Sequence, residues 1–211
     1  MAFAKRYKVI GFDTNEIKID KLKRYKSYIK DIPDAILRSR EINFIPTTNE
    51  YLLSDCNFKI ICVPTPLDER REPNLKFVKS ASEIIAKHLH KGQFVILEST
   101  TYPGTTEEEI VPILEKTGLK AGIDFGIAYS PERVDPGNTK FGIENTPRVV
   151  GGIDKKCTEI AARLYASIIN ARIIKVRDNT TGHSALLFEA DSDSGMLEEN
   201  KISLNSFKNA K

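Results

Sequence analysis

Long apolar runs, a basic stripe and a paired set of cysteines are all missing from this sequence of 211 residues. No apolar run approaches the roughly 20 residues that a membrane-spanning helix needs, so we expect no membrane partner. The formal net charge is +3 and charges of both signs are interleaved, which argues against a nucleic-acid partner. Lys5 and Arg6 interrupt the first residues, so the amino terminus does not resemble a signal peptide.

Cysteine is scarce, and its spacing suits neither a metal site nor a set of disulfides. The three cysteines are Cys56, Cys62 and Cys157. Cys62 lies in an apolar run, and we expect it to be a small buried hydrophobic residue. We therefore expect a reducing, cytoplasmic location and no metal. The 40% hydrophobic and 29% charged residues that are present are typical of a folded globular chain.

Short apolar runs alternate with segments of helical periodicity along most of the chain. We expect strands at residues 7–12, 42–45, 58–63, 93–97, 124–129, 148–150 and 172–176. We expect helices at residues 15–24, 49–54, 75–90, 107–116 and 154–168. Pro46 should close its strand, and Thr105 or Thr106 and Asp154 should cap their helices. The alternation predicts an α/β fold with a mainly parallel sheet and helices on both faces.

Polar loops follow three of the predicted strands, beginning after Val63, Leu97 and Tyr129. The carboxyl ends of parallel strands share one edge of a sheet, where ligands bind, so these loops should converge on one crevice. Two prolines flank Thr65 in the first loop and would fix its hydroxyl group. Each loop alone is equally well explained as an ordinary polar connection.

Two acidic residues stand out at the ends of predicted strands. Asp13 ends the predicted strand at residues 7–12. In a dinucleotide-binding fold, an acid at the end of the second strand accepts hydrogen bonds from the adenosine ribose hydroxyls, and the alternative is that Asp13 simply caps the next helix. Glu132 precedes Arg133 in a proline-stiffened loop. This pair is either a surface ion pair of little energetic value or a site acid whose charge state Arg133 tunes.

Together these motifs resemble the N-terminal, NAD-binding domain of the nucleotide-sugar 6-dehydrogenases, the UDP-glucose/GDP-mannose dehydrogenase family. The similarity is greatest to the UDP-N-acetylhexosamine branch and covers about residues 1–178. The residues that carry it are Val9-Ile-Gly-Phe-Asp13, Val63-Pro-Thr-Pro66, Glu98-Ser-Thr100, Pro103-Gly-Thr105 and the loop at residues 130–138.

The resemblance implies that NAD accepts two hydrides while the C6 alcohol of a UDP-sugar is oxidised to a carboxylate. At matching positions, Asp13 would hold the adenosine ribose of NAD, with Lys18 nearby. Thr65 and Thr100 would contact NAD, and Thr100 would also help to position a catalytic water.

The same resemblance assigns the substrate side of the site. Glu132 would stand at the reacting carbon as a proton acceptor or water positioner. Arg133 and Val134 would contact the nucleotide sugar. Full-length members of the family are expected to be homo-oligomers.

The chain also departs from the family pattern. The family's first strand and glycine-rich turn are missing, so we expect an incomplete NAD-binding domain at residues 1–177. Residues 178–211 form a divergent tail, with Leu186 and Ala190 where the family has a catalytic lysine and an asparagine. No catalytic thiol is matched, so we expect the isolated chain to be inactive and to bind NAD weakly. The alternatives are a non-catalytic or vestigial binding module, and another Rossmann dehydrogenase such as a 3-hydroxyacid enzyme.

A missing central strand would leave two strand edges unpaired, at residues 7–12 and 58–63. Either the sheet splits, or these two strands pair directly. Because unpaired buried backbone groups are costly, direct pairing is the favoured expectation, in a domain of marginal stability.

Overall fold

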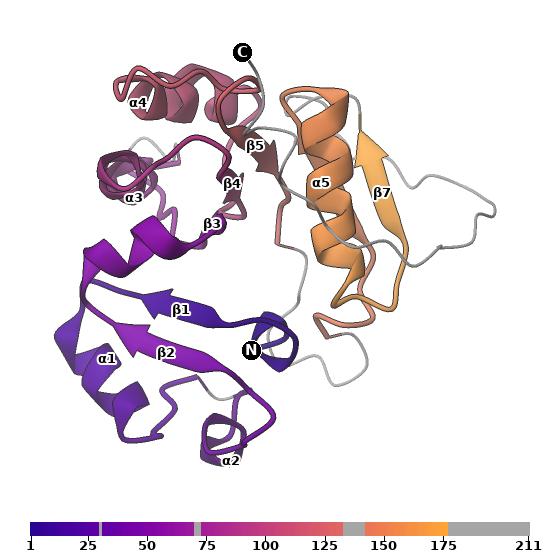
Figure 1. Cartoon of the computed structure of the whole chain (residues 1–211). Helices are drawn as coiled ribbons and strands as arrows, with labels where there is room; N and C mark the ends of the chain where they lie inside the picture. Colours follow the sequence, from indigo (N-terminus) through magenta and orange to yellow (C-terminus); the bar gives the residue numbers. More distant parts are fainter. Residues whose placement is uncertain (30, 70–72, 133–141, 177–211) are drawn as a thin grey trace.

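The computed structural model describes residues 1–29, 31–69, 73–132 and 142–176 (Figure 1). Arg133 and Val134 lie outside the described residues, as does the predicted tail at residues 178–211. The described part is an α/β structure, as the alternating pattern predicted.

The strands form two separate sheets, which Figure 1 shows as a lower pair and an upper group. In the smaller sheet, β1 (Val9–Phe12) runs parallel to β2 (Phe44–Thr47). The larger sheet has the order β3-β4-β5-β6-β7, and only its β5–β6 pair is antiparallel. Its strands are β3 (Phe58–Ile61), β4 (Phe94–Leu97), β5 (Gly126–Tyr129), β6 (Arg148–Gly152) and β7 (Ile173–Val176). The prediction of a mainly parallel arrangement is confirmed.

The helices connect these strands. They are α1 (Glu16–Lys23), α2 (Asp34–Leu37), α3 (Lys76–Lys87), α4 (Val111–Glu115) and α5 (Lys155–Ala166). Shorter turns are the 3-10 helices η1 (Phe3–Lys5) and η2 (Glu50–Asp55) and the π-helical turn η3 (Thr106–Ile110). The short helix α2 was not expected from the sequence.

Two hydrophobic clusters cover opposite faces of the larger sheet. Val95 and Leu97 of β4 belong to the cluster that includes α3 and α4, whereas Phe94 and Ile96 belong to the cluster that includes α5. Alternate residues of a strand point to opposite faces, so a wholly apolar strand contributes to both clusters. The prediction of helices on both faces is confirmed (Figure 1).

The expectation that the strand at residues 7–12 pairs directly with the strand at residues 58–63 is wrong. β1 pairs with β2 and β3 pairs with β4, in different sheets. The turn η1 instead bridges the two sheets. Its Phe3 ring lies 5.8 Å from the Tyr165 ring of α5, and its Ala4 carbonyl accepts a 2.8 Å hydrogen bond from Asn43 N at the start of β2. This bridge maintains contact between the sheets without joining them through strand pairing.

Three local expectations can be compared with the structure. Pro46 does not close its strand but lies within β2. Neither Thr105 nor Thr106 caps η3: no side-chain cap is present, and Thr105 Oγ1 donates to Tyr102 O instead. Asp154 does cap α5, because its Oδ1 accepts a hydrogen bond from Cys157 N at 2.6 Å. A side-chain cap depends on how the chain enters the helix, which residue type alone does not determine.

Candidate active site at the carboxyl ends of the strands

The loops after β3, β4 and β5 lie side by side because these neighbouring strands are parallel. Backbone hydrogen bonds join the loops: Glu98 N donates to Ile61 O at 2.9 Å, and Ser130 N donates to Leu97 O at 2.9 Å. A longer bond of 3.3 Å runs from Glu132 N to Glu98 O. The three polar loops are therefore adjacent, as the sequence predicted.

Arg148 reaches these loops from β6. Because β6 is antiparallel to β5, with Tyr129 opposite Gly151, the amino end of β6 lies beside the loop that follows β5. Arg148 Nη2 lies 3.1 and 3.0 Å from the two carboxylate oxygens of Glu132, and Nη1 lies 2.6 Å from Glu98 Oε1. One planar guanidinium group thus binds two carboxylates at once.

Two further side chains complete what we call the Glu98–Arg148 cluster, which consists of Cys62, Glu98, Glu132, Arg148 and Tyr165. The Tyr165 hydroxyl donates to Glu98 Oε1 at 2.7 Å, and Cys62 Sγ donates to Glu98 Oε2 at 3.0 Å. The Arg148 guanidinium carbon also lies 4.6 Å from the centre of the Tyr165 ring. The Glu98 carboxylate therefore accepts three hydrogen bonds in one fixed orientation.

The cluster is buried on one side and open on the other. The side chains of Arg148 and Glu98 are only 6% and 13% exposed, whereas that of Glu132 is 40% exposed. Glu132 is thus the carboxylate of the cluster that an incoming molecule can reach.

The buried charges affect their neighbours. Burial alone would lower the pKa of Arg148, but the carboxylates of Glu98 and Glu132 contribute to a net rise in that pKa. Burial and the Glu98 carboxylate raise the pKa of Tyr165 well above its usual value. At neutral pH, Arg148 is therefore a permanent cation and Tyr165 a neutral donor.

The expectation that Cys62 is a buried hydrophobic residue is wrong. The strand ends at Ile61, and Cys62 is an exposed free cysteine. Protein atoms still crowd its sulfur, and this desolvation, together with the Glu98 carboxylate, raises the pKa of the thiol. Because the thiolate is the nucleophilic form, Cys62 is poorly suited to nucleophilic catalysis.

Thr65 and Thr100 lie on the first two of the three loops. Thr65 is half-buried and Thr100 is exposed. Ser99 Oγ joins these loops by donating to Val63 O at 2.7 Å. The fold thus places both predicted threonines at the same edge of the sheet as Glu132.

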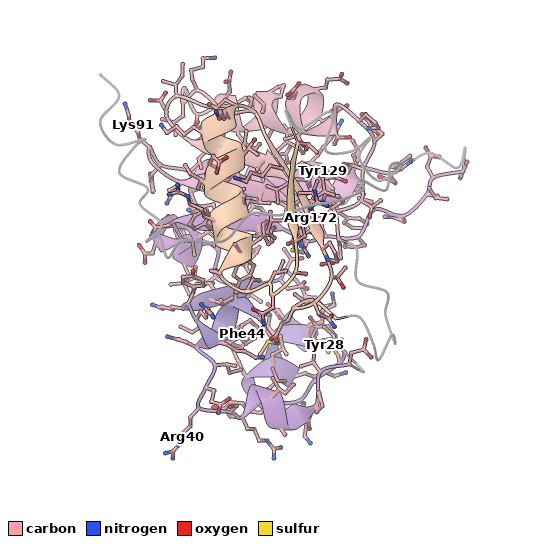
Figure 2. All side chains as sticks on the ribbon, turned by 90° about the vertical axis from the view of Figure 1, so that its right-hand side faces the viewer. Tyr28, Arg40, Phe44, Lys91, Tyr129 and Arg172 are labelled. Atoms are coloured by element: carbon pink, nitrogen blue, oxygen red, sulfur yellow. The ribbon has the colours of Figure 1, made fainter. Side chains whose placement is uncertain are left out.

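Asp13 and Lys18 lie apart from that group, Asp13 at the end of β1 in the smaller sheet and Lys18 in helix α1. Asp13 follows β1, and its Oδ2 lies 3.1 Å from Lys18 Nζ. Lys18 Nζ lies 5.7 Å from the ring centre of Tyr28, which Figure 2 shows in the lower part of the molecule, well below Tyr129 of the larger sheet.

Asp13 is not the cap of the helix that follows it. Asn15 holds that position, because its Oδ1 accepts a hydrogen bond from Lys18 N at 3.1 Å. The Asp13 side chain is 32% exposed at the carboxyl end of its strand. A partly exposed carboxylate there fits the ribose hydroxyls of a dinucleotide. Among the described residues, no glycine-rich turn offers a matching cradle for the pyrophosphate.

Sequence reasoning missed Glu98, Arg148 and Tyr165 as members of a site. The expected partner of Glu132 was Arg133, which lies outside the described residues, and Arg148 is a partner that the sequence did not suggest. One signal could have revealed the role of Arg148, which is the only charged residue of β6. All residues of this strand are buried. A cation in a buried strand requires nearby carboxylates.

Among the described residues, no group of three or more histidine, cysteine or acidic side chains is placed to hold a metal ion. No helix in this part of the chain is long and apolar enough to cross a membrane.

Comparison with known proteins agrees with this geometry. Residues 1–169 match the model of the UDP-glucose/GDP-mannose dehydrogenase family, NAD binding domain. The chain is 39% identical over 189 residues to a UDP-N-acetyl-D-glucosamine 6-dehydrogenase of Pseudomonas aeruginosa, covering 89% of this chain and 44% of that protein. It is 38% identical over 190 residues to protein CapL of Staphylococcus aureus, covering 90% of this chain and 44% of that protein.

A solved structure of the UDP-D-ManNAc dehydrogenase from Pyrococcus horikoshii superposes with a TM-score of 0.79 at 34% identity, covering 86% of this chain and 44% of that one. The chain thus spans less than half the length of these relatives. The matched segment is their cofactor-binding part, and its cofactor is NAD. The chain therefore belongs to the UDP-glucose/GDP-mannose dehydrogenase family and corresponds to its N-terminal, NAD-binding domain.

Proposed function

We propose that this chain is the cofactor-binding part of an enzyme that oxidises the C6 alcohol of a UDP-N-acetylhexosamine to the uronate. The observation that carries this proposal is that Arg148 forms ion pairs with both Glu98 and Glu132, beside the loops that contain Thr65 and Thr100. It supplies a fixed, accessible carboxylate at the edge of the sheet where ligands of such folds bind. The names of the similar dehydrogenases support the choice of substrate.

NAD, when bound, accepts hydride from the substrate carbon. Asp13 would accept hydrogen bonds from the adenosine ribose, and its ion pair with Lys18 would hold its carboxylate in place. Thr65 and Thr100 would contact the part of NAD that lies over the larger sheet. Thr100 is exposed, so its hydroxyl group can also hold a water molecule near the substrate.

Glu132 would act at the reacting carbon. Oxidation of an alcohol to a carboxylate removes two hydrides, consumes one water molecule and releases protons. Glu132 would accept a proton from the alcohol or orient the water, and Arg148 keeps its carboxylate from rotating. Arg133 and Val134 would contact the nucleotide sugar.

A second reading is that the chain binds nucleotides without performing this chemistry. The three cysteines favour this reading for the isolated chain. Cys62 donates to Glu98, Cys157 is buried in α5, and Cys56 follows η2 with a pKa raised by burial. None of them is an activated thiolate, so the chain alone should be unable to form a thiol adduct of the sugar aldehyde.

A chimera separates the two readings. Residues 1–169 of this chain would replace the matching segment of the Pseudomonas aeruginosa relative, which retains its remaining residues. The chimera should produce NADH from UDP-N-acetylglucosamine, and the isolated chain should not. A well-folded chimera that binds NAD and the sugar but produces no NADH would favour the binding module. NADH production by the isolated chain would refute the expected inactivity.

A further inference from the structure

The chain turns back sharply at the end of helix α1. Lys26 N donates to Lys21 O at 2.8 Å, and Tyr25 has a φ of 57°, in the left-handed region. This is the hydrogen-bond pattern of a Schellman motif, in which the left-handed position is usually glycine. Among the described residues, Tyr25 is the only residue other than glycine with a positive φ. Such a strained residue persists only where surrounding contacts hold it, so the contacts of the next residues show what the turn achieves.

The segment that follows this turn is held in a fixed conformation. Asp34, at the start of α2, accepts a hydrogen bond from Ser27 N at 2.8 Å and forms an ion pair with Lys26 Nζ at 2.9 Å. Ser27 Oγ donates to Ile29 O at 2.9 Å and accepts a hydrogen bond from Ile29 N at 3.1 Å. Tyr28 lies between these anchored residues, so its backbone position is fixed by the protein itself.

The turn carries the Tyr28 ring back to the first half of α1. Lys18 Nζ lies 5.7 Å from the centre of this ring, and the same nitrogen lies 3.1 Å from Asp13 Oδ2 (Tyr28 is labelled in Figure 2). A lysine ammonium group within about 6 Å of an aromatic ring is attracted to it. Lys18 therefore links the Tyr28 ring to the carboxylate that follows β1.

The Tyr28 ring is not part of the hydrophobic core. Tyr28 is 44% exposed, and its neighbours Tyr25 and Ile29 are 52% and 46% exposed. Apolar side chains stabilise the fold in proportion to the area that they remove from water, so this segment contributes little to stability. A flat ring that is held in place, partly uncovered and close to an acid at the carboxyl end of a strand is a surface on which a nucleobase can stack.

We propose that the adenine base of NAD stacks on Tyr28, which rests on the role of Asp13 in the proposed function. In NAD, the base is attached to the ribose carbon next to the one that carries the 2′-hydroxyl. A base whose ribose is bound by Asp13 therefore lies close to that carboxylate, where Lys18 holds the Tyr28 ring. Stacking uses the face of the base, so Tyr28 adds affinity and fixes the base without any hydrogen bond to its edge.

Nuclear magnetic resonance of the whole chain tests the stacking directly. The chain has seven tyrosines and no tryptophan. With carbon-13-labelled tyrosine rings, the Tyr28 signal is the one that disappears in Tyr28→Phe. Addition of AMP should move this signal to lower frequency, because a stacked base shields the ring beneath it. Ribose 5-phosphate, which lacks the base, should leave the signal in place.

Isothermal titration with AMP measures the affinity of matched variants. Tyr28→Ala should weaken AMP binding by about tenfold, a loss typical of one stacked base. Tyr28→Phe keeps the ring and should bind AMP as the wild type does. Tyr51→Ala removes a tyrosine that is 74% exposed on η2, and it should leave AMP affinity unaltered. The spectra need only the wild type and Tyr28→Phe, so the test stands even if Tyr28→Ala fails to fold.

Four results would each overturn the proposal. They are no AMP binding by the wild type, AMP binding without movement of the Tyr28 signal, full AMP affinity in Tyr28→Ala, and an equal loss of affinity in Tyr51→Ala. Asp13→Ala separates this failure from failure of the cofactor placement. If Asp13→Ala weakens AMP binding and Tyr28→Ala does not, only the role of Tyr28 is wrong. If neither variant changes AMP affinity, the placement of adenosine in the proposed function is wrong as well.

Discussion

Arg148 Nη1 lies 2.6 Å from Glu98 Oε1, and this ion pair joins the first residue of β6 to the residue that follows β4. It is the most buried ion pair among those of the described residues, with side chains 6% and 13% exposed. A pair this deeply buried affects the fold as well as the site, because removal of one partner leaves an uncompensated charge in the interior.

Arg148→Met should therefore destabilise the protein by about 3 kcal/mol or more, because the Glu98 carboxylate would remain buried without its cation. Urea unfolding followed by circular dichroism measures the change. The matched control is Lys175→Met, which removes an exposed ion pair with Glu159 and should cost less than about 1 kcal/mol. Equal costs for the two variants would contradict the importance of the buried pair.

Glu132→Gln, made in the chimera described above, should lower kcat by about 100-fold, which is typical of a lost proton acceptor. Its effect on the free energy of unfolding should be small, because the Glu132 side chain is 40% exposed and Glu98 still pairs with Arg148. Steady-state NADH formation and thermal unfolding are the two measurements. An unchanged kcat would exclude a chemical role for Glu132.

Asp13→Ala should weaken NAD binding by about 10-fold or more, which corresponds to the loss of hydrogen bonds to a charged group. UDP-sugar binding should change little, because Asp13 lies on the smaller sheet, away from Glu132. Isothermal titration with each ligand measures both effects in the chimera. Asp20→Ala, an exposed acid on the same helix α1, is the control and should leave NAD affinity unaltered.

Lys59 should make stability depend on pH in the mildly alkaline range. Burial lowers the pKa of Lys59 to about 8, so above that pH the unfolded chain binds more protons than the folded one. The contribution of Lys59 to the free energy of unfolding should therefore rise with pH above about 8, by at most about 1.4 kcal/mol per pH unit. The stability difference between the wild type and Lys59→Met should shift in favour of the wild type from about pH 7 to pH 9. A constant difference would show that Lys59 does not titrate in this range.

Gly152→Ala should destabilise the protein by about 1–3 kcal/mol, because the added methyl group would overlap the start of α5. A Cβ at Gly152 would meet the backbone nitrogen of Thr158 and lie 2.6 Å from the carbonyl carbon of Cys157. Gly142→Ala is the control, since its nearest neighbour would be 4.0 Å away. Thermal unfolding of the two variants should differ clearly, and similar melting temperatures would argue against the close approach of β6 and α5.

Local features of this protein were predictable from the sequence because they depend on neighbouring residues. The apolar run at β4 predicted a buried strand, and Asp154 was correctly expected to cap α5. The alternation of strands and helices determined the fold class, and the position of Thr65, Thr100 and Glu132 after strands placed them at one edge of the sheet.

Tertiary structure alone decided which groups meet. Arg148 and Glu98 are 50 residues apart in the chain, and the antiparallel register of β6 brings them into contact. Tyr165 and Glu98 are 67 residues apart, and the packing of α5 brings them into contact. Pro46 could remain in β2 only because it faces an outer edge. The division into two sheets was equally beyond local pattern, since apolar strands of the same kind can pair or stay apart. Which of these occurs depends on the register, helix packing and bridging contacts of the whole chain.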